Sequence, residues 1–258
     1  MNFKEKVCIV TGGSNGIGRC IADEFLIKGA KVAVADINDT GRKILEGKYN
    51  SSRFLFVKGD LTQERVLNDF HAQVLKKFGN VDYIINNAST NKKGILSGCN
   101  YADFNYVLKL GAAVPYMIVK LFKDSLNEGA AVVNISSTRA FMSQKDSESY
   151  TAAKGAITAL THALSISLAG KVRINSISPG WIDTGAYQNN EHYAPDFSEE
   201  DRKQHPAGRI GTPKDIAKAA LFLCSAEAGF INGENIVIDG GMSKLMIYNN
   251  DDGWKYTL

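Results

Sequence analysis

Cysteine, proline and long apolar runs are scarce in this sequence, and each scarcity excludes a class of protein. Its 258 residues include four cysteines, five prolines and two tryptophans. The cysteines form no C-x-x-C pair and no metal-ligand spacing, so we expect reduced thiols and no metal site. No apolar stretch approaches the roughly 20 residues that span a bilayer, and the first apolar run is too short for a signal peptide. These absences predict a cytoplasmic protein that does not contact a membrane.

Charge of one sign is also scarce. The formal net charge is +3, and no run of Lys or Arg accompanies it, which argues against a nucleic-acid partner. Hydrophobic residues make up 44% of the chain and charged residues 22%, as in ordinary globular proteins. The length suits one large α/β domain over residues 1–258 better than two small domains.

Apolar runs alternate with helical patterns along nearly the whole chain. The runs are continuous rather than alternating, which indicates strands buried on both faces. Strand–helix–strand order with such strands predicts a doubly wound Rossmann fold, with a parallel sheet of about seven strands and helices on both faces. The expected strands are 6–10, 31–35, 53–58, 83–85, 130–135, 171–176 and 235–238. The expected helices are 18–28, 63–78, 101–123, 150–168 and 213–225.

A glycine-rich loop follows the first expected strand and opens the first expected helix. Residues 11–18 read T-G-G-S-N-G-I-G. Glycines allow a sharp turn and a close approach of the backbone to a pyrophosphate, which the helix N-terminus then binds. Any tight strand–helix turn also uses glycine, but the place of this loop after the first strand favours dinucleotide binding.

Asp36 ends the second expected strand, 18 residues after Gly18. A carboxylate there can accept hydrogen bonds from the adenosine ribose of NAD and would repel the 2′-phosphate of NADP. Ile37 follows Asp36, and Asn15 rather than a basic residue precedes Gly16, so nothing basic lies beside it in the sequence. The alternative is an aspartate that merely turns the chain. We expect NAD(H).

Five short motifs, in the expected order and with the expected separations, resemble those of the short-chain dehydrogenase/reductase family. The resemblance covers nearly the whole chain. The motifs are T-G-x-x-x-G-x-G at 11–18, an acidic residue with leucine at Asp60-Leu61, N-N-A-S in place of N-N-A-G at 86–89, Y-x-x-x-K at 150–154 with Ser137 thirteen residues before it, and P-G at 179–180. A single-domain oxidoreductase that acts on CH–OH groups is what this resemblance implies.

Tyr150 and Lys154 lie four residues apart on an expected helix and therefore share a face. A tyrosine has a pKa of roughly 10, which a nearby ammonium lowers, so Tyr150 can exchange a proton with a substrate oxygen. Ser137, chosen over Ser136 from the family's separation to the tyrosine, can hold the same oxygen. We expect Ser137, Tyr150 and Lys154 to be catalytic.

The resemblance also implies the cofactor contacts. Asp60 and Leu61 would contact the adenine, Lys154 the nicotinamide ribose, and Ile182 and Thr184 the carboxamide. The full set expected at the cofactor is Gly12, Ser14, Asn15, Gly16, Ile17, Gly18, Asp36, Asp60, Leu61, Asn87, Ala88, Ser89, Tyr150, Lys154, Pro179, Gly180, Ile182 and Thr184.

The sequence departs from the family at one position. The family often has an asparagine in the helix after the fourth strand, where it is thought to hold a water that links the lysine to solvent. One register puts Gly111 there and a rival register puts Leu108 there, so neither supplies an amide. We expect catalysis to survive, with room for a water relay around Gly111.

The substrate side is less determined by the sequence. Residues 185–211 lack a clear period and match the family's substrate loop. Trp181 and Phe141 are candidate pocket walls, and Arg139 is expected either to bind an anionic substrate or to form a surface salt bridge. The apolar tail at 242–258 would pack on a neighbouring subunit of a homotetramer or homodimer.

The substrate is expected to be a secondary alcohol or ketone. The sequence leaves open whether it is a sugar or polyol, a steroid or a 3-oxoacyl compound. The alternative to an enzyme is a cofactor-binding sensor or scaffold with little or no turnover.

Overall fold

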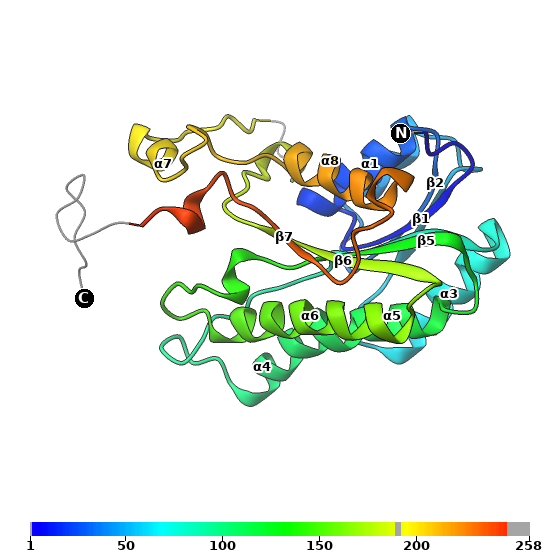
Figure 1. The fold of residues 1–258 in the computed structure, drawn as a ribbon, viewed down its shortest axis with the longest axis horizontal. Coiled ribbons are helices and arrows are strands. Elements are labelled where there is room, and N and C mark those ends of the chain that lie inside the picture. The colour runs from blue at the N-terminus through cyan, green and yellow to red at the C-terminus, as the bar shows by residue number, and fades with distance from the viewer. Residues whose placement is uncertain (1, 189–191, 247–258) are drawn as a thin grey trace.

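Seven parallel strands form one sheet at the centre of the protein (Figure 1). The structure is a computed structural model that describes residues 2–188 and 192–246. The strand order is β3-β2-β1-β4-β5-β6-β7. The strands are β1 (Val7–Thr11), β2 (Lys31–Asp36), β3 (Phe54–Lys58), β4 (Val81–Asn86), β5 (Leu126–Ile135), β6 (Val172–Pro179) and β7 (Asn235–Ile238). This arrangement confirms the predicted doubly wound fold.

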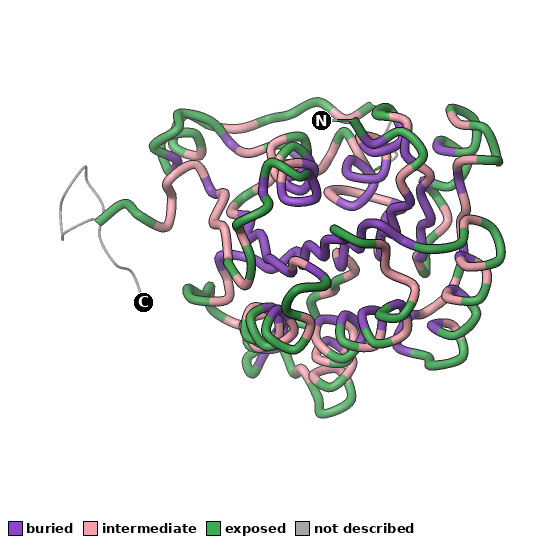
Figure 2. Tube along the Cα trace, turned by 45° about the vertical axis from the view of Figure 1, so that its right-hand side comes forward, coloured by how far each residue is buried: buried purple, intermediate pink, exposed green. Residues whose placement is uncertain are grey.

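Helices cover both faces of the sheet. On one face α1 (Gly16–Ile27), α2 (Arg42–Lys48) and α8 (Pro213–Cys224) contribute to one apolar core, and on the other α3 (Glu64–Phe78), α5 (Val114–Phe122) and α6 (Glu148–Ser167) contribute to a second. Successive residues of β1 alternate between the two cores: Cys8 and Val10 enter the first, Val7 and Ile9 the second. Double-sided burial explains why the strands read as continuous apolar runs. The burial is visible along the central strands in Figure 2.

The chain reverses its direction of winding beside β1. From β1 it proceeds to β2 and β3 on one side, and from β4 onward to the other. Crossovers that leave in opposite directions open a crevice at the carboxyl ends of the strands, where ligands bind in open α/β sheets. The residues after β1, β2, β4 and β5 therefore converge on this edge.

The expected helix at 101–123 is interrupted. It begins as α4 (Tyr101–Leu108), widens into the π-helical segment η1 (Lys109–Ala113) and continues as α5, whose first turn contains Pro115. Short π-helical segments inside α-helices often occur at functional sites.

Two short helices were not anticipated. One is α2, and the other is α7 (Glu199–Lys203) within the expected substrate loop. That loop also contains the turn η3 (Gly185–Tyr187), and an isolated bridge joins Ile182 to Gly211 across its base. No helix in the described part of the chain has the length and apolar character needed to cross a membrane.

Candidate active site

The glycine loop is folded too tightly to accept larger residues. Gly12 has φ +66°, and a Cβ there would lie 2.7 Å from the Cα of Ala88. A Cβ on Gly18 would collide with the carbonyl oxygen of Gly12. Asn87 ties the loop to β4, because its Nδ2 donates to the carbonyls of Thr11 (3.1 Å) and Gly12 (2.9 Å). These constraints fix the backbone at the start of α1, as a phosphate-binding turn requires.

A cleft of about 300 Å³ opens over this loop. The N-terminus of α1 borders the cleft at Asn15 and Gly16, so the helix dipole and the first amides suit a pyrophosphate. The cleft is lined by residues from the ends of β1, β2, β3 and β4 and from the first helices after them. The lining residues are Gly12, Asn15, Gly16, Ala35, Asp36, Ile37, Gly59, Asp60, Leu61, Asn87, Ala88, Ser89, Tyr106, Leu110 and Gln188.

Of the residues expected at the cofactor, Ser14 and Gly18 line neither this cleft nor the adjoining cavity. Ser14 is buried, and its Oγ accepts a hydrogen bond from the Gly41 amide at 2.9 Å. Gly18 packs closely against the Gly12 carbonyl, which leaves no room for a side chain at position 18. In this structure the two residues support the glycine loop. Tyr106, Leu110 and Gln188 line the cleft but were missed, because no motif marks them.

Asp36 lies at the edge of the cleft and is half-buried. Its carboxylate accepts from the backbone amides of Ser14 and Asn38, each at 2.9 Å. Burial raises its pKa, and the two amides oppose that effect. The carboxylate is thereby oriented by the backbone and still faces the ligand space, where a ribose hydroxyl can donate to it.

A second cavity of about 240 Å³ adjoins the cleft, because Asn87 and Ser89 line both. It brings together all three residues predicted to be catalytic and the residues that follow β6. The lining residues are Ile17, Asn87, Ser89, Ile135, Ser136, Ser137, Tyr150, Lys154, Pro179, Gly180, Ile182 and Thr184. A dinucleotide can therefore run from the Asp36 end of the cleft to the cavity that contains Tyr150.

Lys154 is buried beside the tyrosine ring. Its Nζ donates to the carbonyl of Ile135 at 2.8 Å and lies 5.3 Å from the centroid of the Tyr150 ring. Burial lowers the pKa of the Lys154 ammonium to about 8, since the apolar surroundings disfavour the charged form. Lys154 can thus lose or hold its proton close to neutral pH.

Tyr150 differs from the sequence-based expectation. Burial raises its pKa above the ordinary value rather than leaving it lowered by the lysine. Three groups act in the opposite direction: a hydrogen bond with Ser137, the positive charge of Arg139 and a hydrogen bond with Ser89. The expectation considered the charge of Lys154 but not the burial of the phenol, which is the larger effect.

The two neighbouring serines have different partners. Ser136 Oγ donates to the Lys154 carbonyl at 3.0 Å and lies 2.8 Å from Thr158 Oγ1, so it is directed at α6. Ser137, at the start of the turn η2 (Thr138–Ala140), is hydrogen-bonded to Tyr150. The structure thus places Ser137 next to the phenol, as adjacent residues of an extended chain point in opposite directions.

The expected pocket walls lie elsewhere. Neither Phe141 nor Trp181 lines the cavity around Tyr150. Trp181 packs edge-on against Phe197 in the substrate loop (ring centroids 5.8 Å apart) and lies near buried His205 (5.9 Å). These aromatics therefore attach the loop to the body, and their positions correct the pocket-wall prediction.

Gly111 is buried and leaves no room above its Cα. A Cβ there would lie 2.8 Å from the Cβ of Ala153 on α6. Its φ is not positive, so the requirement for glycine is close packing of η1 on α6 and not a special backbone conformation. We expected space for water in place of the missing side chain, but on the side of η1 that faces α6 that expectation is wrong, because Ala153 fills the space.

The loop before α6 carries the other unexpected polar contacts. Ser149 Oγ donates to the Lys93 carbonyl at 2.7 Å, and Asp146 accepts the Leu96 amide at 2.8 Å. These bonds hold residues 93–97 against the first turn of the helix that bears Tyr150. Within residues 2–188 and 192–246, no group of three or more His, Cys, Asp or Glu side chains could hold a metal ion.

Comparison with known proteins identifies the family of the chain. A family profile described as "Enoyl-(Acyl carrier protein) reductase" matches residues 12–243. An uncharacterized oxidoreductase of Thermotoga maritima is 37% identical over 250 residues, which are 94% of this chain and 98% of that protein. The chain belongs to the short-chain dehydrogenase/reductase family.

Two further members of this dehydrogenase/reductase family are similar to the chain. Mouse L-fucose dehydrogenase is 35% identical over 248 residues, covering 93% of this chain and 89% of that protein. The solved structure of an apo SCOR enzyme from Clostridium thermocellum matches with a TM-score of 0.88 and 40% identity, and each chain is covered completely. The family consists of oxidoreductases that use nicotinamide cofactors and small-molecule substrates.

Proposed function

We propose that this protein transfers a hydride between NAD(H) and a secondary alcohol or ketone, with Tyr150 as the general acid and base. One observation carries the proposal. Ser137, Tyr150 and Lys154 line one cavity, and that cavity adjoins the cleft that Asp36 borders. This arrangement supports the proposal, because Tyr150 would lie beside one end of a dinucleotide bound along the cleft.

The chain's own residues account for the proton chemistry. Bound nicotinamide would supply or accept the hydride, which leaves the protein to move one proton and position the substrate. Tyr150 takes the proton of an alcohol or returns one to a carbonyl oxygen, and Ser137 holds that oxygen by a hydrogen bond. The positive charge of Arg139 lowers the pKa of Tyr150 against the larger effect of burial, and so favours the phenolate that oxidation needs.

Preference for NAD over NADP rests on Asp36. Its carboxylate is held by two backbone amides at the edge of the cleft, in position to accept from a ribose 2′-hydroxyl. A 2′-phosphate at the same place would meet a negative charge, and the Asp36 carboxylate would lose the hydroxyl that donates to it.

For the substrate we favour a sugar or polyol over a steroid or an acyl thioester. The similar mouse protein is named for the oxidation of L-fucose.

The test is a panel of secondary alcohols with NAD and NADP, including L-fucose and other aldoses, polyols and a hydroxysteroid. We expect NAD-dependent turnover on at least one sugar, and kcat/KM lower by about 10²-fold or more for Tyr150→Phe, since general acid–base groups contribute about 10²–10⁴-fold. NADH binding without turnover on any alcohol or ketone would favour the sensor or scaffold.

Assembly and location complete the proposal. We propose a homotetramer or homodimer in the cytoplasm. Of the apolar tail, Leu245 and Met246 are exposed, whereas Tyr248, Trp254 and Tyr256 lie outside the described residues. Size-exclusion chromatography with light scattering, before and after truncation at Gly241, tests whether the tail contributes to the assembly.

A further inference from the structure

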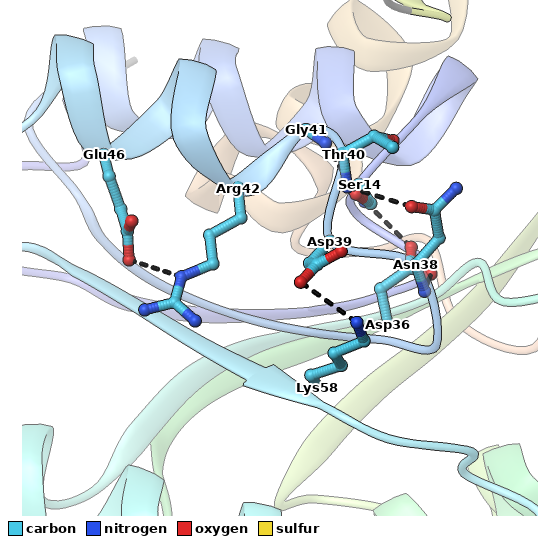
Figure 3. A network of polar contacts seen from close by, with 9 residues as sticks. All are labelled: Ser14, Asp36, Asn38, Asp39, Thr40, Gly41, Arg42, Glu46 and Lys58. Carbon is cyan, nitrogen blue, oxygen red and sulfur yellow. Dashed lines mark hydrogen bonds and ion pairs between the residues drawn. The ribbon is translucent and has the colours of Figure 1, made fainter.

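A small charged cluster surrounds Asp36 at the ends of β2 and β3 (Figure 3). Asp36 is the last residue of β2, and its partner in the parallel register is Lys58, the last residue of β3. Side chains at neighbouring register positions lie on the same face of a sheet, within reach of each other for a long lysine. The register by itself therefore predicts an ion pair between Lys58 and Asp36.

The lysine has a different partner. Its Nζ lies 3.0 Å from Oδ2 of Asp39, and in the described part of the chain no ion pair joins it to Asp36. Asp39 stands in the turn after β2, where its side chain is 46% exposed and that of Lys58 is 57% exposed. The hydrogen bond with Lys58 lowers the pKa of Asp39, which favours the charged form of that carboxyl group. Asp36 is left with its two backbone donors and its open side toward the cleft.

The second cation of the cluster is also held by a carboxylate of its own. Arg42 Nε lies 2.8 Å from Oε1 of Glu46, one turn further along α2. Three carboxylates and two cations give the cluster of Figure 3 a formal charge of 2 − 3 = −1. Each cation of the cluster is therefore paired with a carboxylate other than Asp36, which lines the cleft.

We propose that Asp39 is a second determinant of cofactor choice, because it holds Lys58 away from Asp36. The inference rests on the proposed use of NAD(H). If Asp39 lost its charge, the Lys58 ammonium would turn to its register partner across the two strands, Asp36. There it would compete with the ribose hydroxyls for that carboxylate, and it would also offer a positive charge to a 2′-phosphate.

The test measures binding and needs no substrate. NADH and NADPH are titrated by fluorescence into wild-type protein, Asp39→Asn and the double variant Asp39→Asn/Lys58→Met. We expect Asp39→Asn to lower the ratio of the NADPH to the NADH dissociation constant about tenfold. The Lys58 ammonium would attract the 2′-phosphate of NADPH, and it would partly neutralise the Asp36 carboxylate that binds the ribose of NADH. The double variant should return the ratio to within about twofold of wild type, because the diverted cation is gone.

A matched control comes from the other end of the same strand. Lys31 begins β2 and pairs with Glu5 at 2.8 Å, away from the cleft. Glu5→Gln should leave the ratio unchanged. The effect of Asp39→Asn should also weaken as salt rises from about 0.05 M to 0.5 M, since exposed charges are screened.

Two outcomes would overturn the inference: an unchanged ratio in Asp39→Asn, or a double variant that keeps the altered ratio of the single one. Failure of the proposed function is seen separately, in the wild type alone. A wild-type protein that prefers NADPH would refute the choice of NAD(H), whereas the role of Asp39 is judged only by the change that its substitution makes. Thermal unfolding of each unliganded variant within about 2 °C of wild type shows that the fold is intact.

Discussion

Replacing Gly111 with alanine should lower both the stability of the protein and its kcat, because the added methyl group has no space against α6. Its carbon would lie 2.8 Å from the Cβ of Ala153, whereas nonbonded carbons are at their best separation at about 3.5–4.0 Å. The helices must therefore separate locally by about 0.7 Å or more. Overpacking of a core costs about 1–3 kcal/mol, and the better helix propensity of alanine offsets about 0.5–1 kcal/mol of it.

The net loss is then about 0.5–2 kcal/mol, which corresponds to a fall in Tm of roughly 1–8 °C for a domain of this size. Activity should fall as well. Ala153 immediately precedes Lys154, whose Nζ is fixed at 2.8 Å from the Ile135 carbonyl. A displacement of about 1 Å in an active site can cost about 10²-fold, so we expect kcat lower by about 10–100-fold.

The assay is urea unfolding followed by tryptophan fluorescence, together with kcat on the best substrate of the panel. The compensating variant Gly111→Ala/Ala153→Gly moves the methyl group from α6 to η1 and restores the gap. We expect it to recover most of the lost kcat, with a positive coupling energy in the double-mutant cycle. If Gly111→Ala were as stable and as active as wild type, or if the two substitutions were simply additive, close packing would not be the reason for glycine at this position.

Three further predictions concern the site and its loop. Arg139→Met removes a positive charge that lowers the pKa of Tyr150, so the pH at which alcohol oxidation reaches half its maximum should rise by about 0.5–1 pH unit; an unchanged kcat/KM profile would refute this. Burial lowers the pKa of Lys154 to about 8, so between about pH 8 and 10 the unfolded chain holds a proton that the folded protein has released. The stability of wild type relative to Lys154→Met should therefore increase with pH over that range in urea unfolding, and a decrease would contradict the effect assigned to burial. Trp181→Ala removes the ring contacts with Phe197 and His205, so amide hydrogen exchange across the 197–205 segment should quicken about tenfold while exchange in β1 stays unchanged; equal protection in both proteins would show that the loop is held by other contacts.

The order of strands and helices follows from sequence because the central strands β1, β2, β4 and β6 are buried on both faces. A short continuous apolar run such as that in β1 is typical of a buried parallel strand, and the glycine loop adds a turn that few residues can form. The short helices α2 and α7 were not predictable in the same way. In α2 only Leu45 is buried and in α7 no residue is, so no apolar stripe marks either one in the sequence.

Sequence predicts which residues gather in the candidate site, but it does not predict their pKa values or how tightly they pack. Spacing alone places Tyr150 and Lys154 on one face of a helix, whereas the pKa of each depends on burial by segments far away in the chain. Gly111 shows the same limit. Its identity suggested space, and only the distance to Ala153 reveals that the position is crowded. The link between Lys58 and Asp39 likewise depends on the conformation of a turn that no motif encodes.

Burial changes Tyr150 and Lys154 in complementary ways. It raises the pKa of the phenol and lowers that of the ammonium, so in both residues the neutral form gains. A reactive phenolate therefore needs positive charge brought to it within the cavity. Arg139 supplies part of that charge already, and the ammonium of Lys154 supplies more whenever it holds its proton, at 5.3 Å from the ring. Any cationic group that enters beside Tyr150 would favour both the phenolate and the release of the lysine proton. Positive charge in the cavity therefore favours the form of Tyr150 that can accept a proton.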